Sequence, residues 1–310
     1  MNNSGVLGCH ISNGPIDLPD LNRMLAMGLQ HYTLLHYQSE YLPTLRSSAS
    51  GLLLVRYYDT NLLPKSPANY AQAVADEYKY WSLYTHHVVF ANELNLQEEG
   101  GNGYDDPAAV ASWVVTVAQV LRRLAPDIVM HCPALSPNGN WLTYLAHLAV
   151  WHKLFDVIDL HVYGTLDSMK QQYDSATKLF PSSTRFFVSE FNGPGAWDFM
   201  KWIQGDPRCI AATYFSWHWH NPPDWWSLDL RGSYLEQQLL KLKENTMALE
   251  DEFPNEYAAW VAAGGITANL RKHLIGIGSI VPSPSDLRFL ADECKASAEQ
   301  LRNALANYPF

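Results

Sequence analysis

Short apolar segments rich in Val, Ile, Leu and Phe alternate along the chain with longer segments in which apolar residues recur every three or four positions. The first pattern is typical of buried strands and the second of amphipathic helices, so their alternation predicts βαβ units and a parallel sheet. Eight segments are predicted to be strands: Val6–His10, Tyr32–His36, Leu52–Tyr58, His87–Ala91, Ile128–Cys132, Val157–Val162, Phe186–Glu190 and Ile210–Trp217.

Eight helices are expected to follow these strands in turn: Leu18–Met27, Tyr41–Ser47, Asn69–Trp81, Pro107–Leu124, Asn140–Leu154, Leu166–Leu179, Ala196–Gln204 and Tyr234–Lys243. The fourth helix has the clearest ends. Asp105 and Asp106 offer an N-cap, Pro107 stands in the first turn, and Arg122 and Arg123 occupy the last turn.

Eight strand–helix units of this length predict an α/β fold, a (β/α)8 TIM barrel over residues 1–244. A doubly wound open sheet is the alternative, but it would normally have fewer units and a glycine-rich phosphate turn. Residues 245–310 show no strand pattern and are expected to form a helical C-terminal extension. Its last helix, predicted over Ser285–Ala306, has an apolar face that is expected to pack on the barrel or, alternatively, to serve in self-association or assembly.

Composition narrows the choice of partner. A net charge of -10 argues against nucleic acid and against an anionic membrane surface, because both would repel the protein. Aromatic residues form 13% of the chain and include 11 Trp, which suits a neutral ligand with apolar ring faces, such as a sugar. The four cysteines have no metal-binding spacing and are interpreted as reduced core residues. No cofactor motif, signal peptide or membrane-spanning stretch is expected, and the cellular location stays open.

Candidate chemistry is sought at the C-terminal ends of the strands, where barrels of this type form their active sites. Two glutamates, Glu93 and Glu190, follow equally apolar segments at the ends of the fourth and seventh predicted strands. Either one alone would more often be a solvated rim residue. Together they would face each other, and glycoside hydrolysis needs such a pair: one carboxyl protonates the leaving oxygen, and the other attacks the anomeric carbon or activates water.

These positions resemble the clan A glycoside hydrolases, a group of retaining (β/α)8 glycosidases. Asn92-Glu93 matches the family's Asn-Glu dipeptide after strand four, and Glu190 matches its second glutamate after strand seven. His161-Val162-Tyr163 is similar to a His-x-Tyr motif after strand six, and Trp217 to a sugar-platform tryptophan after strand eight. The motifs are two or three residues long and occur in the family's order.

The resemblance implies a retaining hydrolase of β-glycosidic bonds in a poly- or oligosaccharide, with Glu93 as acid/base and Glu190 as nucleophile. It also implies that Asn92 donates to the sugar 2-hydroxyl, that Tyr163 hydrogen-bonds to Glu190, and that Trp217 forms the floor of the subsite beside the cleaved bond. The remaining substrate-binding candidates at strand ends are Arg56, His131, His161, Trp219 and Asn192.

The chain departs from the family's usual pattern in two places. Leu94 follows Glu93 where the family usually has proline, and Arg56 is only a loose match for a basic residue at an early strand end. The long segments Gln97–Asp106 and Trp219–Trp226 favour a polymeric substrate, a β-glycan or a cell-wall glycan. The sugar, the linkage, and endo or exo action stay open.

Three other functions are compatible with parts of the pattern. A metal-dependent TIM-barrel hydrolase would use the closely spaced His218 and His220. A non-catalytic carbohydrate-binding barrel would have the same tryptophans but would not need facing carboxylates. A serine or cysteine hydrolase is the third possibility. The chain has no G-x-S-x-G motif, and the pairs Cys9-His10 and Cys132-His131 are better explained by packing at strand ends.

Overall fold

The computed structural model describes residues 7–218 and 229–240. The chain divides into two compact units, Val6–Ser233 and a second unit that contains the C-terminal residues. Within the second unit only residues 234–240 are described, and they are helical. The predicted extension over residues 245–310 lies outside the described residues and stays a prediction.

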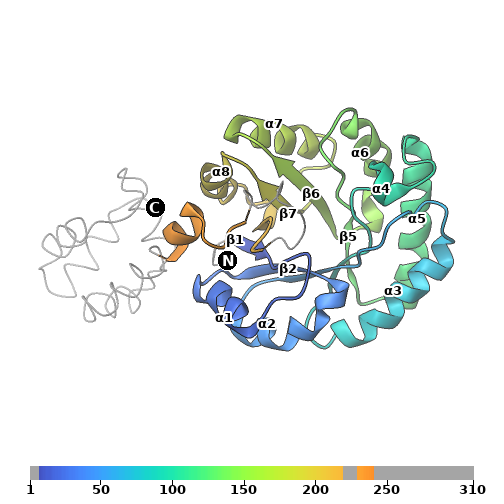
Figure 1. Ribbon diagram of the computed structural model, residues 1–310. Coiled ribbons are helices and arrows are strands. Elements are labelled where there is room, and N and C mark those ends of the chain that lie inside the picture. The colour runs from blue at the N-terminus through green and yellow to red at the C-terminus, as the bar shows by residue number, and fades with distance from the viewer. Residues whose placement is uncertain (1–6, 219–228, 241–310) are drawn as a thin grey trace, which may run out of the picture. The chain divides into compact units, whose positions relative to one another are not determined.

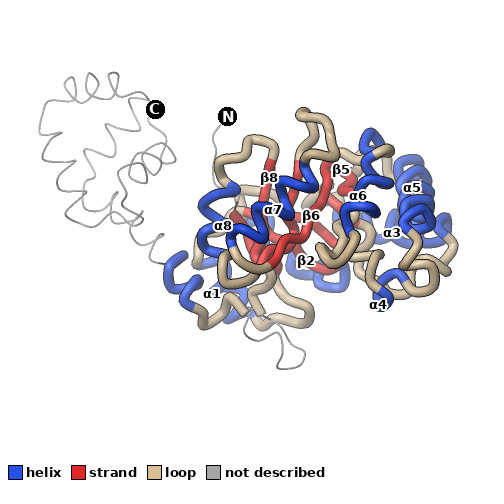
Figure 2. The backbone as a smooth tube through the Cα atoms, turned by 90° about the horizontal axis from the view of Figure 1, so that it is seen from above, coloured by secondary structure: helices blue, strands red, loops and turns tan. Residues whose placement is uncertain are grey.

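The first unit is built on a closed parallel barrel in which each strand pairs with its sequence neighbours and β1 pairs with β8. Figures 1 and 2 show the strands enclosed by the helices. This confirms the predicted (β/α)8 fold and excludes the open doubly wound sheet. The strands are β1 (Leu7–His10), β2 (His31–Leu35), β3 (Leu53–Arg56), β4 (His87–Val89), β5 (Val129–Cys132), β6 (Val157–Tyr163), β7 (Phe186–Asn192) and β8 (Cys209–Tyr214).

The helices cover the outside of the barrel: α1 (Leu18–Ala26), α2 (Leu42–Ser48), α3 (Pro67–Trp81), α4 (Gln97–Gly100), α5 (Pro107–Leu124), α6 (Trp141–Ala149), α7 (Leu166–Thr177) and α8 (Ala196–Ile203). Two short 3₁₀ helices, η1 (His36–Tyr41) and η2 (His152–Leu154), complete them. The short helix α4 was not predicted. Among the described helices, none combines the length and the apolar character needed to cross a membrane.

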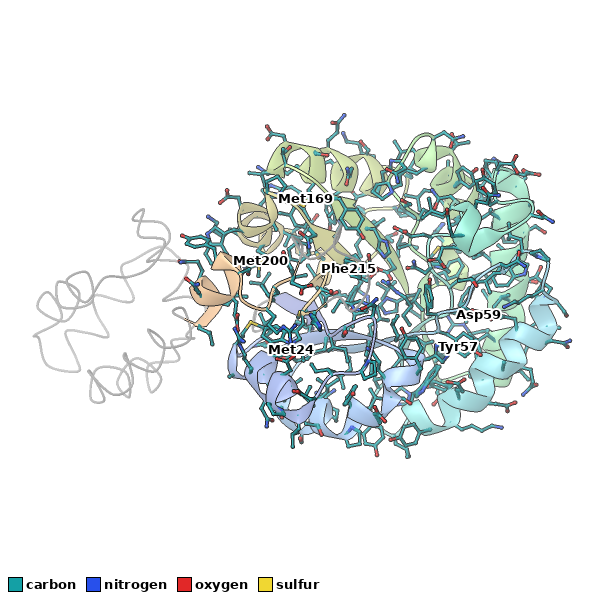
Figure 3. The ribbon with its side chains drawn as sticks, in the orientation of Figure 1. Met24, Tyr57, Asp59, Met169, Met200 and Phe215 are labelled. Carbon is teal, nitrogen blue, oxygen red and sulfur yellow. The ribbon has the colours of Figure 1, made fainter. Side chains whose placement is uncertain are left out.

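The helix ends follow from local chemistry. On α5 the Asp106 side chain accepts a hydrogen bond from the Ala108 amide, and on α3 the Ser66 side chain accepts one from Asn69. Both caps satisfy amides that have no partner within the helix. The inner faces of the helices are apolar; Figure 3 labels Met24, Met169 and Met200 on α1, α7 and α8, and all three side chains are fully buried.

One irregularity in the sheet matters for the site. Leu160 of β6 pairs with Val188 of β7, but the next residue, His161, pairs with Glu190, so Ser189 is an extra residue in β7. Successive side chains of a regular strand point to opposite faces. A bulge breaks that alternation and can re-aim a side chain. Here it brings both Ser189 and Glu190 to the inside of the barrel, where both contact Arg56.

Candidate active site

Glu93 and Glu190 approach each other at the C-terminal ends of the strands. Glu190 lies within β7, whereas Glu93 lies beyond the end of β4 in a loop held by two hydrogen bonds, from the Glu93 amide to the Ala134 carbonyl (3.1 Å) and from the Leu96 amide to the Glu93 carbonyl (2.8 Å). The backbone of Glu93 has a φ of 29°. L-residues rarely adopt that conformation and are strained by about 1 kcal/mol or more in it. Strain at a polar residue in a pocket is typical of functional sites.

Glu190 is held ionised by its neighbours. Arg56, the last residue of β3, donates a hydrogen bond to Oε1, and the Tyr163 hydroxyl donates one to Oε2. Burial favours the neutral acid, but the neighbouring His161 and Arg56 outweigh burial and lower the pKa of Glu190 to about 2. The carboxylate therefore carries its negative charge at any physiological pH.

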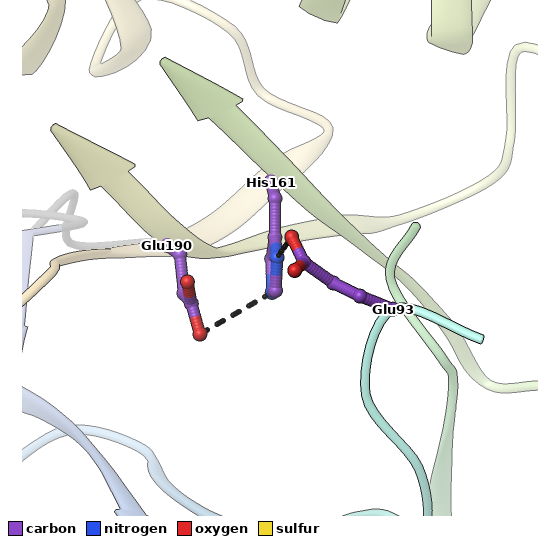
Figure 4. A group of neighbouring side chains, drawn as sticks. All are labelled: Glu93, His161 and Glu190. Atoms are coloured by element: carbon purple, nitrogen blue, oxygen red, sulfur yellow. Dashed lines mark hydrogen bonds and ion pairs between the residues drawn. The ribbon is translucent and has the colours of Figure 1, made fainter. Parts of the chain in front are cut away.

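His161 lies between the two carboxylates, as Figure 4 shows. Its Nδ1 is 2.7 Å from Glu93 Oε1, and its Nε2 is 3.7 Å from Glu190 Oε1. Nε2 is also 3.1 Å from Arg56 Nη2, which can only donate. In this arrangement Nε2 is therefore the acceptor, and Nδ1 carries the hydrogen that is donated to Glu93.

Burial disfavours the charged His161 ring, yet Glu190 and Glu93 together raise the pKa of His161. A second proton could enter only at Nε2, since Nδ1 already carries one. That step would break the contact with Arg56. The ring is consequently fixed in orientation, with one nitrogen directed at each side of the site.

A second layer of polar groups supports Arg56. Its Nη2 donates to Ser189 Oγ (2.7 Å), and Ser189 Oγ lies 3.1 Å from His161 Nε2. Asp159, buried within β6, accepts a hydrogen bond from the Ser189 amide (3.1 Å). Burial raises the pKa of Asp159 to about 6, against the opposing effect of Arg56 and His161. These contacts fix the guanidinium that orients Glu190.

His10, the last residue of β1, completes the polar interior. Its side chain is buried, and neither ring nitrogen has a hydrogen-bond partner among the residues that the structure describes. Burial, together with the charge of Arg56, lowers the pKa of His10 to about 3. The ring is thus neutral at physiological pH and adds no charge to the site.

The same three side chains could in principle hold a metal ion. Ligand atoms of Glu93, His161 and Glu190 all lie within 4.8 Å of one another, and they form the one such group found in the described part of the chain. Arg56 argues against a bound cation, because its guanidinium already donates to Glu190 and to His161. The alternative pair, His218 and His220, is only half described: the ring of His218 contacts Asp229 and Arg231, and His220 lies outside the described residues.

Four of the other predicted site residues are brought to the carboxylates: Arg56, His161 and Tyr163 by the contacts above, and Asn92 by its place directly before Glu93. The side chain of Asn92 is buried, with Nδ2 3.5 Å from Glu99 Oε1. Its predicted bond to a substrate hydroxyl stays a prediction.

The structure does not bring His131 to this cluster. His131 pairs along the sheet with Val89 and Val157, which belong to the apolar core of the barrel. Its Nε2 lies 3.0 Å from Nδ1 of His87, the first residue of β4, so the side chain is turned toward the N-terminal end of the strands. A residue inside a strand can point to a different level of the barrel from one that follows the strand.

Asn192 and Trp217 are both enclosed by protein. The Asn192 amide donates to the Phe215 carbonyl, and its Oδ1 accepts from the Tyr214 hydroxyl (3.2 Å), so the side chain joins β7 to the end of β8. Trp217 has no exposed surface, and the Arg23 guanidinium of α1 lies 5.6 Å from its ring centroid. A sugar therefore finds no open face of Trp217 in this conformation. Trp219 lies outside the described residues.

Three residues of the site were not singled out from the sequence: Ser189, Asp159 and Glu99. A signal existed for Asp159, because a charged residue interrupts the otherwise apolar run of β6. Ser189 was hidden by the bulge, since a regular strand would point it away from Glu190. Glu99 was missed because it lies on α4, a short helix that the pattern did not predict.

The sequence matches no protein-family model and no curated protein. Among solved structures, it is similar to an endo-β-1,4-glucanase of Xanthomonas axonopodis pv. citri carrying a triple mutation, with 11% identity and a TM-score of 0.54, over 76% of this chain and 98% of that chain. A GH128 endo-β-1,3-glucanase of Lentinula edodes gives 20% identity and a TM-score of 0.47, over 68% of this chain and 83% of that chain. The GH53 catalytic domain of Ignisphaera aggregans gives 13% identity and a TM-score of 0.48, over 68% of this chain and 79% of that chain. At such identities the likeness concerns the fold alone.

Proposed function

We propose that this protein hydrolyses β-glycosidic bonds by a retaining mechanism, with Glu190 as nucleophile and Glu93 as acid/base. One observation carries the proposal: two carboxyl groups from β7 and from the loop after β4 have oxygen atoms within 4.8 Å of each other, in unlike surroundings. Glu190 accepts from Arg56 and Tyr163 and is ionised. Glu93 is the more exposed of the two, with 14% of its side chain accessible against 6%.

The two carboxyl groups have different roles in the two steps of the reaction. In the first step a Glu190 oxygen bonds to the anomeric carbon, the bond from that carbon to the leaving oxygen breaks, and Glu93 gives its proton to the leaving oxygen. In the second step Glu93 takes a proton from water, the water oxygen bonds to the anomeric carbon, and Glu190 leaves as a carboxylate. The approach of one oxygen of each carboxyl to within 4.8 Å supports the retaining route. Retaining enzymes place the carboxyls about 5 to 5.5 Å apart, whereas inverting ones leave about 6.5 to 9.5 Å for a water.

His161 suits both steps. Nδ1–H donates to Oε1 of Glu93, so the transferable proton belongs on Oε2 of the same carboxyl group. The hydrogen bond therefore orients the acid without competing for its proton. His161 and Arg56 act on opposite carboxylates while contacting each other, which couples the geometry of the pair.

Two rival functions meet obstacles in the described residues. Ser189, His161 and Glu93 form a contact chain like that of a serine hydrolase, but Ser189 is fully buried and no acyl substrate could reach its hydroxyl. Burial raises the pKa of the Cys9 thiol well above its usual range, which disfavours a thiolate nucleophile. A purely carbohydrate-binding barrel would have no use for a strained Glu93 facing an ionised Glu190.

The test is release of reducing ends from a panel of glycans and aryl β-glycosides. The Xanthomonas barrel that it resembles is an endo-β-1,4-glucanase, so β-1,4-glucans head the panel, followed by β-1,3-glucans and peptidoglycan. Wild type is expected to cleave at least one member. Glu190→Gln should lower its kcat/KM by about 10⁴-fold or more, as removal of a nucleophile does. If no glycan is cleaved, or if Glu190→Gln keeps the activity, the proposal fails.

A further inference from the structure

Glu99 is a third carboxyl group close to the site, and the mechanism above does not use it. It lies on α4, directly after the segment that carries Asn92 and Glu93, and only 8% of it is exposed. Its Oε1 accepts hydrogen bonds from the Tyr58 hydroxyl (3.1 Å) and from Asn92 Nδ2 (3.5 Å). Its Oε2 is buried and has no partner among the residues described.

A buried carboxyl with an unpartnered oxygen is costly to the fold and calls for an explanation. Structural need alone does not supply one, because the backbone carbonyl of Glu99, not its side chain, holds the local chain by accepting from the Leu62 amide (3.0 Å). The side chain instead accepts from the Tyr58 hydroxyl and from Asn92 Nδ2. A carboxylate only accepts, so it selects the orientation in which the Asn92 amide nitrogen faces Glu99.

We propose that Glu99 is a positioning residue that fixes the carboxamide of Asn92 beside the acid/base. The functional part of this inference rests on the proposed function, in which Asn92 donates to the sugar 2-hydroxyl. One N–H of Asn92 Nδ2 goes to Glu99, and the second is then directed to the substrate. Without Glu99 the amide is free to rotate and to present its oxygen, which cannot donate.

The ionisation of Glu99 offers a way to observe the contact in solution. Burial raises the pKa of Glu99 to about 7, the charge of Glu93 adds to this, and Tyr58, Asn92 and Arg56 oppose it. The side-chain amide resonances of Asn92, observed by selective ¹⁵N labelling and assigned with Asn92→Asp, are expected to shift between pH 6 and 8. Glu99→Gln should abolish that shift, whereas Glu98→Gln, a change at the exposed neighbour, should leave it. A pH-independent Asn92 amide would overturn the proposal, whether or not the protein cleaves sugars.

Kinetic measurements test whether Glu99 affects catalysis through the bond from Asn92 to the sugar 2-hydroxyl. On an aryl β-glycoside, Glu99→Ala should lower kcat/KM by roughly 10- to 100-fold, the effect of losing one well-placed hydrogen bond. On the matching 2-deoxy glycoside the same variant should equal wild type, because no 2-hydroxyl is present to receive the bond. Glu99→Gln keeps an acceptor and should recover most of the loss, and Asn92→Ala combined with Glu99→Ala should be no worse than Asn92→Ala alone.

The outcomes separate the two proposals. Equal losses on both glycosides, or additive losses in the double variant, would show general damage and overturn the positioning role. A titrating Asn92 amide in a protein that cleaves no glycan would instead contradict the proposed function and leave the contact between Glu99 and Asn92 established.

Discussion

The two ends of the barrel interior are built from the same strands and differ in chemistry. Toward the N-terminal ends the filling is a cluster of apolar side chains: Leu54, Val89, Val157, Phe187 and Ala211. Toward the C-terminal ends it consists of His10, Arg56, His161, Ser189 and Glu190, none more than 5% exposed. Because so little water reaches the second group, its charges are balanced by one another.

The polar end contains buried polar atoms that destabilise the fold. At the polar end Arg56 Nε, Asp159 Oδ2 and both ring nitrogens of His10 are buried without a partner among the described residues. Each such atom costs about 1 to 3 kcal/mol, which a structural core would avoid. Among the described residues, the apolar end has one comparable group, Nδ1 of His131. We therefore expect substitutions at the apolar end to change stability and substitutions at the polar end to change activity.

The largest expected stability effect is at the apolar end. Leu54→Ala removes a fully buried side chain from the barrel centre and should lower the free energy of unfolding by about 2 to 5 kcal/mol. The kcat/KM of the folded fraction should stay within the same order of magnitude. Denaturant unfolding and assays on the same preparation measure both. A stable variant with poor turnover would contradict the division between the two ends.

Arg56→Met tests the polar end. The ionised form of Glu190 depends partly on the guanidinium, so its removal should raise the pKa of Glu190 from about 2. A lowered carboxylate pKa places the acid limb of activity at low pH, and raising that pKa moves the limb upward, by roughly 1 to 3 pH units. The pH profile of kcat/KM measures this, with Arg56→Lys as a control that keeps the charge. An unmoved limb in Arg56→Met would show that Arg56 does not set the state of Glu190.

The smallest effect is expected outside both ends. Asp106→Ala removes the N-cap of α5 and should cost about 1 kcal/mol of stability, with no change in kcat/KM. Thermal unfolding and the glycoside assay provide the comparison. A change in activity would mean that the outer helices are coupled to the carboxylates more closely than the contacts show.

Much of the fold could be predicted because each unit carries its own signals. The apolar runs predicted all eight strands. The N-cap Asp106 and the first-turn Pro107 predicted the start of α5. The carboxylate pair, Arg56, His161 and Tyr163 were also predicted at strand ends, and the structure brings these side chains together. Each of these depends on local pattern, which the sequence records directly.

The positions of the other side chains in the site depend on the register between neighbouring strands. The bulge at Ser189 turns two successive side chains inward, and no residue type in this segment predicts a bulge. His131 was expected at the pocket because it ends an apolar run, but its place within β5 directs it to His87. Trp217 was expected to be open and is covered at α1 by Arg23. Position along the chain identifies the end of a strand, but not the level at which each side chain meets the interior.

The central claim is that Glu190 forms a bond to the sugar. The direct measurement is intact-protein mass after reaction with a 2-deoxy-2-fluoro-β-glycosyl fluoride of the sugar that the protein cleaves, followed by peptide mapping. Slow turnover of the fluorinated sugar should leave one glycosyl group on the protein, on the peptide that contains Glu190, and none in Glu190→Gln. A protein that cleaves the natural glycoside yet gains no mass, or gains it at another residue, would contradict the account.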